Sequence, residues 1–382
     1  MGSNKQLKIL VFIDWYLPGF KAGGPIRSIA NLVARLPHDF SIVTSDRDHM
    51  ADAPYPNVPT GTWVNGVGRE RVMYLPAEEQ KPATYRRLMR ELDYDVIYVN
   101  SLFSPRFALM PLLAARKAKG RARVIVAPRG MLKKGALSVK AGKKKWFLRA
   151  TKVFGLFKGV RWHATSFDER KEIMRQFGKV EVKVAPNLVG YAEVPGAPLP
   201  KSAGSVKLVS VARVSPEKNV LHALKFIKGA NAALGHWELT WYGVHQDSEY
   251  LAECQAMADS IPHASIHFPG EIHPQHLTKV LADAHFFYLP TLGENFGHAI
   301  VEALLAAKPV LISDRTPWTK LEDRHAGWTL PLDRILFSEM LNHLVAMDQE
   351  TYVSWTDGAR KEGKVIAGNP KDLTRNFGLF HA

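Results

Sequence analysis

Short apolar segments alternate with longer amphipathic segments along most of the chain. In the first half, the runs at residues 9–13, 41–44, 96–99 and 124–127 have the length and composition of buried strands. Apolar residues at helical spacing predict helices over residues 26–36, 83–92 and 109–119. Strands that alternate with helices favour right-handed crossovers and a doubly wound parallel sheet.

The alternation stops at residues 186–204, which are rich in Pro, Gly and Ala and lack helical periodicity, as is typical of a linker. It then resumes. We expect strands over residues 207–211, 238–242, 266–269, 286–289 and 310–312, and helices over residues 220–232, 248–259, 274–282 and 298–306. The sequence therefore predicts an α/β protein with two Rossmann-like domains.

The predicted domains cover residues 1–188 and 205–365, joined by a linker at 189–204. The C-terminal segment, residues 366–382, is expected to pack back toward the first domain. Ligands of such sheets bind at the carboxyl ends of the strands, so two domains of this kind can face one substrate across a cleft.

Composition narrows the class of protein. The chain has 382 residues, 46% of them apolar and 23% charged, which is ordinary globular composition. Its single cysteine, Cys254, excludes an internal disulfide and suits a reducing compartment. No run of apolar residues is long enough to span a membrane, and the run at residues 9–13 is too short for a signal peptide. We expect a cytoplasmic protein.

The charge is unevenly distributed. Residues 1–190 hold 34 Lys or Arg and 15 Asp or Glu, whereas the remainder holds 17 and 21. Residues 96–167 contain seventeen cations and no acid. Such a concentration of positive charge favours an anionic partner, which could be a nucleic acid, an acidic membrane surface or a phosphorylated substrate. The alternative is a solvated basic surface that serves solubility. No nucleic-acid-binding motif accompanies it, so we expect no nucleic acid.

The most informative motif lies in residues 289–304. Glu294 sits in a loop and Glu302 lies eight residues later in the following helix, and Gly293 and Gly297 flank the turn. The N-terminus of that helix would favour a phosphate, and carboxylates accept hydrogen bonds from sugar hydroxyls. Together they suggest a sugar nucleotide. The alternative is a pair of surface glutamates at a helix start.

Two further loops carry candidate ligand groups. Arg213 and Lys218 follow the first strand of the second domain, where a guanidinium fork and an ammonium can hold a diphosphate. Gly23 and Gly24 precede the first helix and allow close approach of a ligand to the backbone. This loop has neither the G-x-G-x-x-G spacing of nicotinamide-binding proteins nor the Lys-Ser/Thr of a P-loop.

These three segments together resemble the retaining glycosyltransferases of family 4, which have the two-domain GT-B fold, and the resemblance covers essentially the whole chain. It implies that Arg213 and Lys218 hold the donor diphosphate, that Glu302 binds the ribose hydroxyls and that Glu294 contacts the donor sugar. Arg213, Lys218 and Glu294 are the implied catalytic residues. The implied donor-binding set is Gly23, Gly24, Arg213, Lys218, Glu294, Asn295, Phe296, Gly297, His298 and Glu302.

The chain departs from this family at two positions. Arg129 replaces a common histidine, so a role that needs an imidazole there has no support. We expect Arg129, together with Arg27, to contact an anionic group of the donor or the acceptor, with a structural role as the alternative for Arg129. Lys308 replaces the usual glycine before Pro309 and is expected to lie at the surface.

We expect no metal and no cofactor beyond the nucleotide sugar as co-substrate. Asp46 and Asp48, and likewise Asp93 and Asp95, have the Asp-x-Asp spacing of metal-binding transferases, but we interpret both pairs as structural. The histidines show no metal-ligand spacing. The resemblance implies displacement on one face of the sugar, in which the leaving diphosphate helps to accept the acceptor's proton.

Residues 143–158 mix basic and aromatic residues at near-helical spacing. The expected apolar stripe consists of Trp146, Phe147, Ala150, Val153, Phe154 and Phe157. Such a helix can lie on an anionic leaflet and present the active site to a lipid-linked acceptor. The predicted membrane contacts are Lys143, Lys144, Lys145, Trp146 and Phe147. The alternative is an ordinary amphipathic helix docked on the first sheet.

The function predicted from the sequence is transfer of a sugar from a nucleotide donor to a glycan. The acceptor is expected to be a lipid-linked, oligosaccharide or polysaccharide intermediate of bacterial surface polysaccharide synthesis, at the inner face of the cell membrane. Another GT-B enzyme, such as a sugar-nucleotide epimerase or a phosphorylase, is the main alternative, and a basic nucleic-acid-binding protein is a weaker one.

Overall fold

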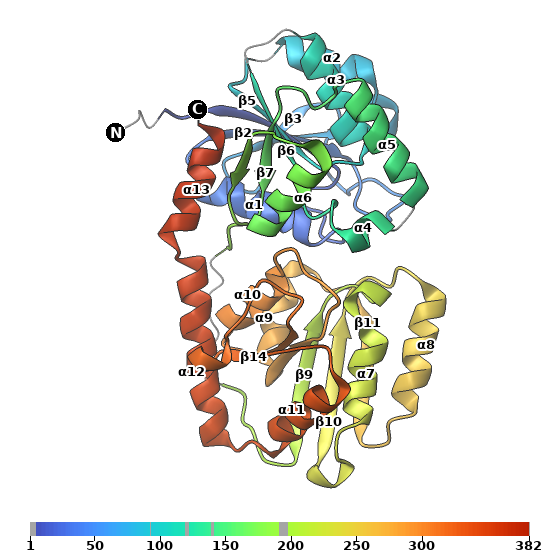
Figure 1. Cartoon of the computed structure of the whole chain (residues 1–382), viewed down its shortest axis with the longest axis vertical. Coiled ribbons are helices and arrows are strands. Elements are labelled where there is room, and N and C mark those ends of the chain that lie inside the picture. Colours follow the sequence, from blue (N-terminus) through green and yellow to red (C-terminus); the bar gives the residue numbers. More distant parts are fainter. Residues whose placement is uncertain (1–4, 92, 119–121, 139–140, 191–197, 382) are drawn as a thin grey trace. The chain divides into compact units, whose positions relative to one another are not determined.

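The computed structural model describes residues 5–91, 93–118, 122–138, 141–190 and 198–381. The chain divides into two compact α/β units (Figure 1). The first unit comprises Met1–Gly190 and the C-terminal Pro370–Ala382, and the second comprises Tyr191–Asn369. Within the described ranges, no helix is both long enough and apolar enough to cross a membrane.

Within the described residues, the first unit contains an eight-stranded sheet of order β3-β4-β2-β1-β5-β6-β7-β8. All neighbours pair in parallel except β3 and β4. The strands are β1 (Lys8–Ile13), β2 (Asp39–Ser45), β3 (Trp63–Asn65), β4 (Arg71–Leu75), β5 (Val96–Asn100), β6 (Arg123–Ala127), β7 (Arg161–Ala164) and β8 (Val182–Val184). The α-helices are α1 (Gly24–Arg35), α2 (Pro82–Glu91), α3 (Met110–Lys117), α4 (Lys134–Ser138), α5 (Ala141–Val153), α6 (Phe167–Phe177) and α13 (Pro370–Phe380).

Both faces of this sheet are buried, which explains the uninterrupted apolar runs in the sequence. Leu10 and Phe12 of β1 face a core shared with α2, α3, α5 and α6. Ile9 and Val11, which alternate with them, face a second core shared with α1 and α13. Arg123 of β6 donates to the carbonyl oxygen of Phe380 at 2.7 Å, so a strand cation also fixes the end of α13.

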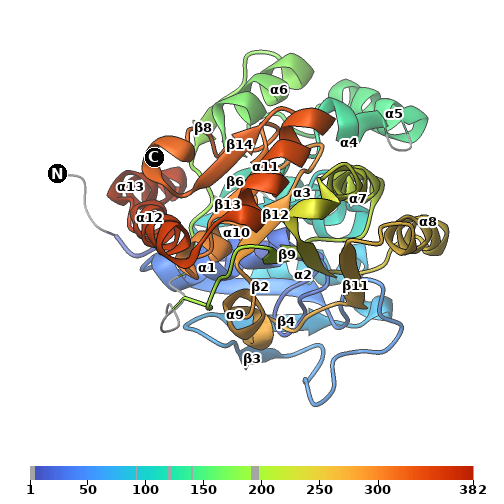
Figure 2. The same cartoon turned by 90° about the horizontal axis from the view of Figure 1, so that it is seen from below.

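The second unit, over its described part, contains a six-stranded parallel sheet of order β11-β10-β9-β12-β13-β14. Its strands are β9 (Ser205–Val211), β10 (His236–Tyr242), β11 (Ala264–Gly270), β12 (Phe286–Leu289), β13 (Val310–Ser313) and β14 (Gly327–Leu330). Its helices are α7 (Val220–Lys228), α8 (Ser248–Asp259), α9 (Pro274–Ala282), α10 (His298–Leu305), α11 (Arg334–Ala346) and α12 (Gln349–Ala367). Helices α7, α8 and α11 cover one face, and α9, α10 and α12 cover the other (Figure 2).

Each strand and helix predicted from the two alternating patterns is present, with ends that differ by a few residues. Residues 92 and 119, at the ends of two predicted helices, and residues 191–197 of the predicted linker lie outside the described residues. The expected helix over residues 143–158 ends earlier, at Val153. Because β9 and β12 are parallel neighbours in the centre of the second sheet, the loops that follow them leave from the same edge. This places the two motifs of the second unit beside each other.

Candidate functional site

The two loops that follow β9 and β12 are joined by a half-buried ion pair. The Lys218 Nζ atom lies 2.5 Å from the Glu294 Oε1 atom, and the two side chains are 12% and 13% exposed. Around this pair, the Leu292 N–H donates to the Glu217 carbonyl oxygen at 3.1 Å, and the Asn219 amide donates to the Pro290 carbonyl oxygen at 2.8 Å. The structure therefore brings two of the predicted catalytic residues into direct contact.

Arg213 lies in the loop that follows β9, and its side chain is more exposed than that of Lys218. Its Nη1 atom donates to Gln246 Oε1 at 2.9 Å, and its Nη2 atom donates to Glu217 Oε2 at 3.1 Å. The Arg213 and Glu217 side chains are 39% and 61% exposed, so this ion pair contributes little stability. A diphosphate can replace Glu217 as the partner of the guanidinium at low cost.

The Glu294 loop ends at a glycine with a special backbone conformation. Gly297 has a φ of 79° and forms the N-cap of α10. A Cβ atom there would also lie 2.8 Å from Ile300 Cδ1. Phe296 and His298 are 8% and 7% exposed, with ring centroids 4.7 Å apart. The buried aromatic side chains thus help to fix the turn.

The remaining predicted residues of the donor-binding set lie at two helix starts. Glu302 is half-buried in the second turn of α10, and Asn295 is half-buried in the loop before it. Gly23 has a φ of 66° and is the N-cap of α1, with Gly24 as the first helical residue. Arg27 is half-buried in the first turn of α1.

The first Asp-x-Asp pair has structural partners. Asp48 Oδ2 accepts the Phe20 and Lys21 N–H groups at 2.7 and 3.1 Å, which fixes the loop after β1. Asp46 Oδ1 accepts from Arg47 Nε at 2.9 Å. Within the described residues, no three His, Cys, Asp or Glu side chains are arranged to hold a metal ion.

The second Asp-x-Asp pair precedes β5. Asp95 Oδ2 accepts the Lys8 N–H at 2.9 Å, and this bond is the largest cause of the lowered pKa of Asp95. Asp93 is exposed in the turn before it. Asp95 therefore joins β5 to the start of β1.

Arg129 lies at the centre of a polar network at the carboxyl edge of the first sheet. Its guanidinium donates to Asn100 Oδ1 at 2.8 and 3.0 Å, to the Tyr98 hydroxyl at 2.9 Å and to Asn187 Oδ1. The Tyr98 hydroxyl in turn donates to His163 Nδ1 at 2.6 Å, and burial lowers the pKa of His163 to about 3. Most of the Arg129 N–H groups are used inside the unit, which favours the structural alternative for this residue.

The expectation of a surface position for Lys308 is wrong. The residue is only 3% exposed, and its Nζ atom donates to the carbonyl oxygens of Ala282 and Ala284 at 3.1 and 2.8 Å. Helix α9 ends at Ala282, so the ammonium satisfies carbonyl groups that the helix leaves open. Burial lowers the pKa of Lys308 to about 8.

The apolar stripe expected over residues 143–158 is divided between two faces. Phe147 packs on Phe103 with ring centroids 5.4 Å apart, and Phe157 is 7% exposed. Lys144 also turns inward and donates to the Ala136 carbonyl oxygen at 2.5 Å. The opposite face exposes Trp146, Val153 and Phe154, at 73%, 81% and 81%, among the exposed cations Lys143, Lys145, Arg149 and Lys152. The expectation of one continuous stripe is therefore wrong.

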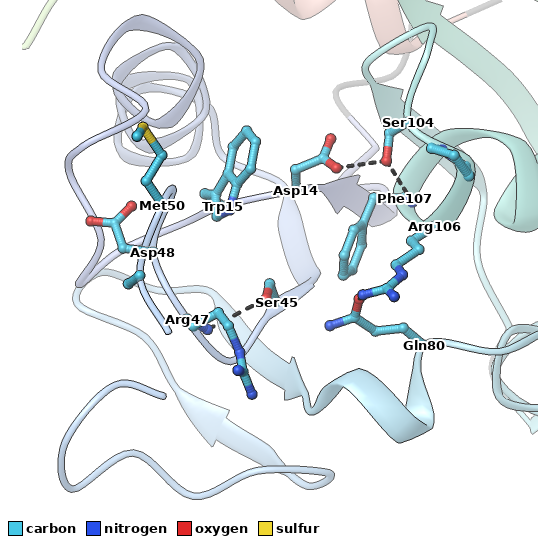
Figure 3. Close-up of a pocket in the computed structure, with 12 residues that line it drawn as sticks. Asp14, Trp15, Ser45, Arg47, Asp48, Met50, Gln80, Ser104, Arg106 and Phe107 are labelled. Atoms are coloured by element: carbon cyan, nitrogen blue, oxygen red, sulfur yellow. Dashed lines mark hydrogen bonds between the residues drawn. The ribbon is translucent and has the colours of Figure 1, made fainter. Parts of the chain in front are cut away.

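A cavity of about 360 Å³ opens at the carboxyl ends of β1, β2 and β5 in the first unit (Figure 3). Its walls include Asp14, Trp15, Arg47, Ser104 and Arg106. Sequence reasoning missed these residues. Asp14 immediately follows the apolar run of β1, and a carboxylate at that position was the available signal.

Comparison with known proteins gives matches over both units. A family model described as "Glycosyl transferases group 1" matches residues 205–346, and one described as "Glycosyl transferase 4-like domain" matches residues 23–187. Comparison with curated protein sequences gives no significant match.

Three solved structures illustrate the similarity in fold. Sucrose-phosphate synthase from Thermosynechococcus elongatus matches with a TM-score of 0.71 and 15% identity, over 97% of each chain. HepE from Anabaena, solved with UDP-glucose, matches with a TM-score of 0.69 and 15% sequence identity, over 98% of each chain. An α,α-trehalose-phosphate synthase from Burkholderia xenovorans was solved with glucose-6-phosphate. It matches with a TM-score of 0.66 and 10% sequence identity, over 98% of this chain and 100% of that one. The fold of the present chain is GT-B.

Proposed function

The chain belongs to the group 1 glycosyltransferases, and on this basis we propose that it is a retaining enzyme that transfers a hexose from a nucleotide sugar to a glycan. The proposed acceptor is a lipid-linked or polysaccharide intermediate of bacterial surface polysaccharide synthesis. The observation that carries the proposal is the Lys218–Glu294 pair beside the start of α10. It supplies a cation for a diphosphate and a carboxylate for sugar hydroxyls at one edge of the sheet.

The chemistry proposed for this site depends on charge that develops on the leaving group. As the bond between the sugar and the diphosphate breaks, negative charge builds on the diphosphate oxygens, and Lys218 and Arg213 stabilise it. Glu294 holds the Lys218 ammonium in place before the reaction. The acceptor oxygen then attacks on the face from which the diphosphate departs, and the diphosphate takes up the hydroxyl proton. The anomeric configuration is retained.

We propose that transfer does not require a divalent metal. The two cations on the second unit can balance the diphosphate charge. The Asp46 and Asp48 carboxylates already bind Arg47 and backbone N–H groups. A metal in that loop would have to displace these bonds.

The outer face of α5 supports a further part of the proposal, which is binding to an anionic membrane surface at the cytoplasmic side. Trp146 and Val153 of α5, and Phe154 directly after its end, are exposed beside four cations, and no acidic residue occurs between residues 96 and 167. Apolar side chains enter the interface between headgroups and acyl chains, while lysines approach lipid phosphates. Such an orientation suits an acceptor anchored in the bilayer.

The experiment that tests the proposed function is a screen of UDP-, GDP-, ADP- and dTDP-sugars by thermal shift and by hydrolysis. We expect one nucleotide sugar to stabilise the protein and to be hydrolysed slowly in excess chelator. Proton NMR of a transfer product should then show the anomeric configuration of the donor. The proposal fails if none of the nucleotide sugars binds, and its retaining part fails if the configuration is inverted.

A further inference from the structure

The loop that carries Glu294 is attached to a second segment of the same unit. We call residues 290–297 the Glu294 loop, and residues 313–318, which comprise the end of β13 and the residues after it, the bracing segment. Because β12 and β13 are parallel neighbours, both loops leave the same edge of the sheet. Three hydrogen bonds join them: Ser313 Oγ donates to the Thr291 carbonyl oxygen at 2.6 Å, the Glu294 N–H donates to the Arg315 carbonyl oxygen at 3.0 Å, and Trp318 Nε1 donates to the Phe296 carbonyl oxygen at 2.6 Å.

The third of these bonds comes from a side chain that also packs on the loop. Trp318 is half-buried, and its ring lies edge-on to that of Phe296, with centroids 5.2 Å apart. An indole N–H can only donate, so the acceptor that it finds determines how a half-buried tryptophan is placed. Here the acceptor is a backbone carbonyl of the Glu294 loop. Trp318 therefore both covers this loop and anchors it.

The backbone of Trp318 is itself fixed by other parts of the unit. Its N–H donates to Thr316 Oγ1 at 3.3 Å, and its carbonyl oxygen accepts from the Thr329 hydroxyl at 3.2 Å. Thr329 belongs to β14, which pairs with β13. The indole is thus connected to the sheet, and a group supported in this way holds its partner more precisely than a group on an unsupported loop.

The Phe296 carbonyl group matters because of the residue that follows it. Gly297 has a φ of 79°, and glycine tolerates many backbone conformations, so the peptide plane between the two residues can rotate at little cost. The C=O and N–H groups of a trans peptide point in opposite directions in one plane. Fixing the Phe296 carbonyl group therefore also fixes the direction of the Gly297 N–H at the start of α10.

We infer that Trp318 is a positioning residue for sugar transfer. Its indole N–H fixes the peptide between Phe296 and Gly297, and so keeps Glu294 in the orientation in which it meets Lys218. The inference rests on the proposed function for the role of Glu294, and on the hydrogen bonds alone for the anchoring of the loop. Trp318 acts through the loop and not by contact with the substrate.

The first measurement needs no ligand. Trp318→Phe keeps an aromatic ring against Phe296 but removes the N–H donor. Amide hydrogen exchange of the full chain, followed by mass spectrometry on peptides that cover residues 290–299, should become about fivefold or more faster than in the wild type. Thr316→Val removes a hydroxyl that holds the Trp318 backbone, so it should act in the same direction. It replaces Trp318→Phe if that variant does not fold.

Trp237→Phe is the matched control. The Trp237 Nε1 atom also donates to a backbone carbonyl oxygen, that of Leu341, at 3.2 Å. Trp237 lies near the amino end of β10, whereas the Glu294 loop leaves the carboxyl edge of the same sheet. This variant loses the same kind of bond, and it should leave both the exchange over residues 290–299 and kcat as they are in the wild type.

The second measurement is hydrolysis of the nucleotide sugar that the screen identifies, at a temperature at which all variants are folded. Trp318→Phe should lower kcat by about tenfold or more and change KM less, because a misplaced group is lost mainly to the transition state. In a Glu294→Gln background, the same change should lower kcat by less than about threefold, since the group that Trp318 positions is already altered. A general loss of stability would lower kcat equally in both backgrounds.

Unchanged hydrogen exchange over residues 290–299 in both Trp318→Phe and Thr316→Val overturns the inference. Faster exchange with a normal kcat overturns it too, as does an equal loss of kcat with and without Glu294→Gln. A wild-type chain that hydrolyses no nucleotide sugar removes the proposed function, whereas the exchange measurement still decides whether Trp318 anchors the loop.

Discussion

The Lys218 ammonium and the Glu294 carboxylate form an ion pair of 2.5 Å between the loops that follow two neighbouring strands. The two residues are 76 positions apart in the chain and come together because β9 and β12 are parallel neighbours. The two side chains are only 12% and 13% exposed, so each partner holds the other in one place. A cation prepared in this way needs little rearrangement when a diphosphate arrives.

We predict that Lys218→Met lowers kcat by about 100-fold or more, because the charge that it stabilises peaks in the transition state. Arg213→Ala should also act mainly on kcat. Steady-state kinetics at saturating donor measures both effects. Lys225→Ala, a change at an exposed position of α7, should leave kcat unchanged. Turnover like that of the wild type in both site variants would remove these residues from catalysis.

For Arg129, we predict a structural effect. Arg129→Ala should lower the free energy of unfolding by about 2–4 kcal/mol, because it leaves Tyr98, Asn100 and Asn187 without their donor. The affinity for the donor should stay close to that of the wild type. Arg87→Ala, which breaks an exposed pair with Glu91, should cost less than about 1 kcal/mol. Normal stability with impaired ligand binding would instead assign Arg129 to the anion contact.

Lys308 gives a dependence of stability on pH. Its pKa is about 8 in the folded chain, below the ordinary value of 10.5, so the unfolded chain binds more protons between these values. The free energy of unfolding of the wild type should therefore rise relative to Lys308→Met, by about 2 kcal/mol between pH 7.5 and 10. Denaturant titration at both pH values measures the difference. Lys279→Met, at an exposed position, should show no such trend.

Membrane binding should depend on the outer face of α5. Lys143→Glu combined with Lys145→Glu should weaken binding to vesicles that contain phosphatidylglycerol by about tenfold or more, since each lysine near an anionic surface contributes about 1 kcal/mol. Lys225→Glu with Lys279→Glu changes the net charge equally on the second unit and serves as the control. Equal vesicle binding by both double variants would contradict a specific role for α5.

The fold was largely predictable because both sheets are buried on two faces, so their central strands appear as plain apolar runs. The short strands β3, β4, β7, β8 and β14 were missed, since segments of three to five residues carry too little periodicity. Helix α12 contains Gly358 and Gly363, and a Cβ atom at Gly363 would lie 2.6 Å from the Leu305 N atom. Its glycines reflect close packing, and sequence reasoning treats such glycines as helix breakers.

The candidate site was predictable where a motif carries the chemistry within a few residues, as around Glu294 and Arg213. The cavity of the first unit was not, because Asp14, Arg47 and Arg106 lie far apart in the sequence and meet only at the edge of the sheet. Lys308 was misplaced for a related reason. The partners of its ammonium are backbone carbonyl groups, which leave no trace in the sequence.

The most direct measurement is a crystal structure of the chain soaked with the nucleotide sugar that the screen identifies. We expect the diphosphate oxygens to lie within hydrogen-bond distance, roughly 3 Å, of Lys218 Nζ and the Arg213 guanidinium, next to the first turn of α10. A bound nucleotide sugar whose phosphorus atoms lie far from both side chains would contradict it.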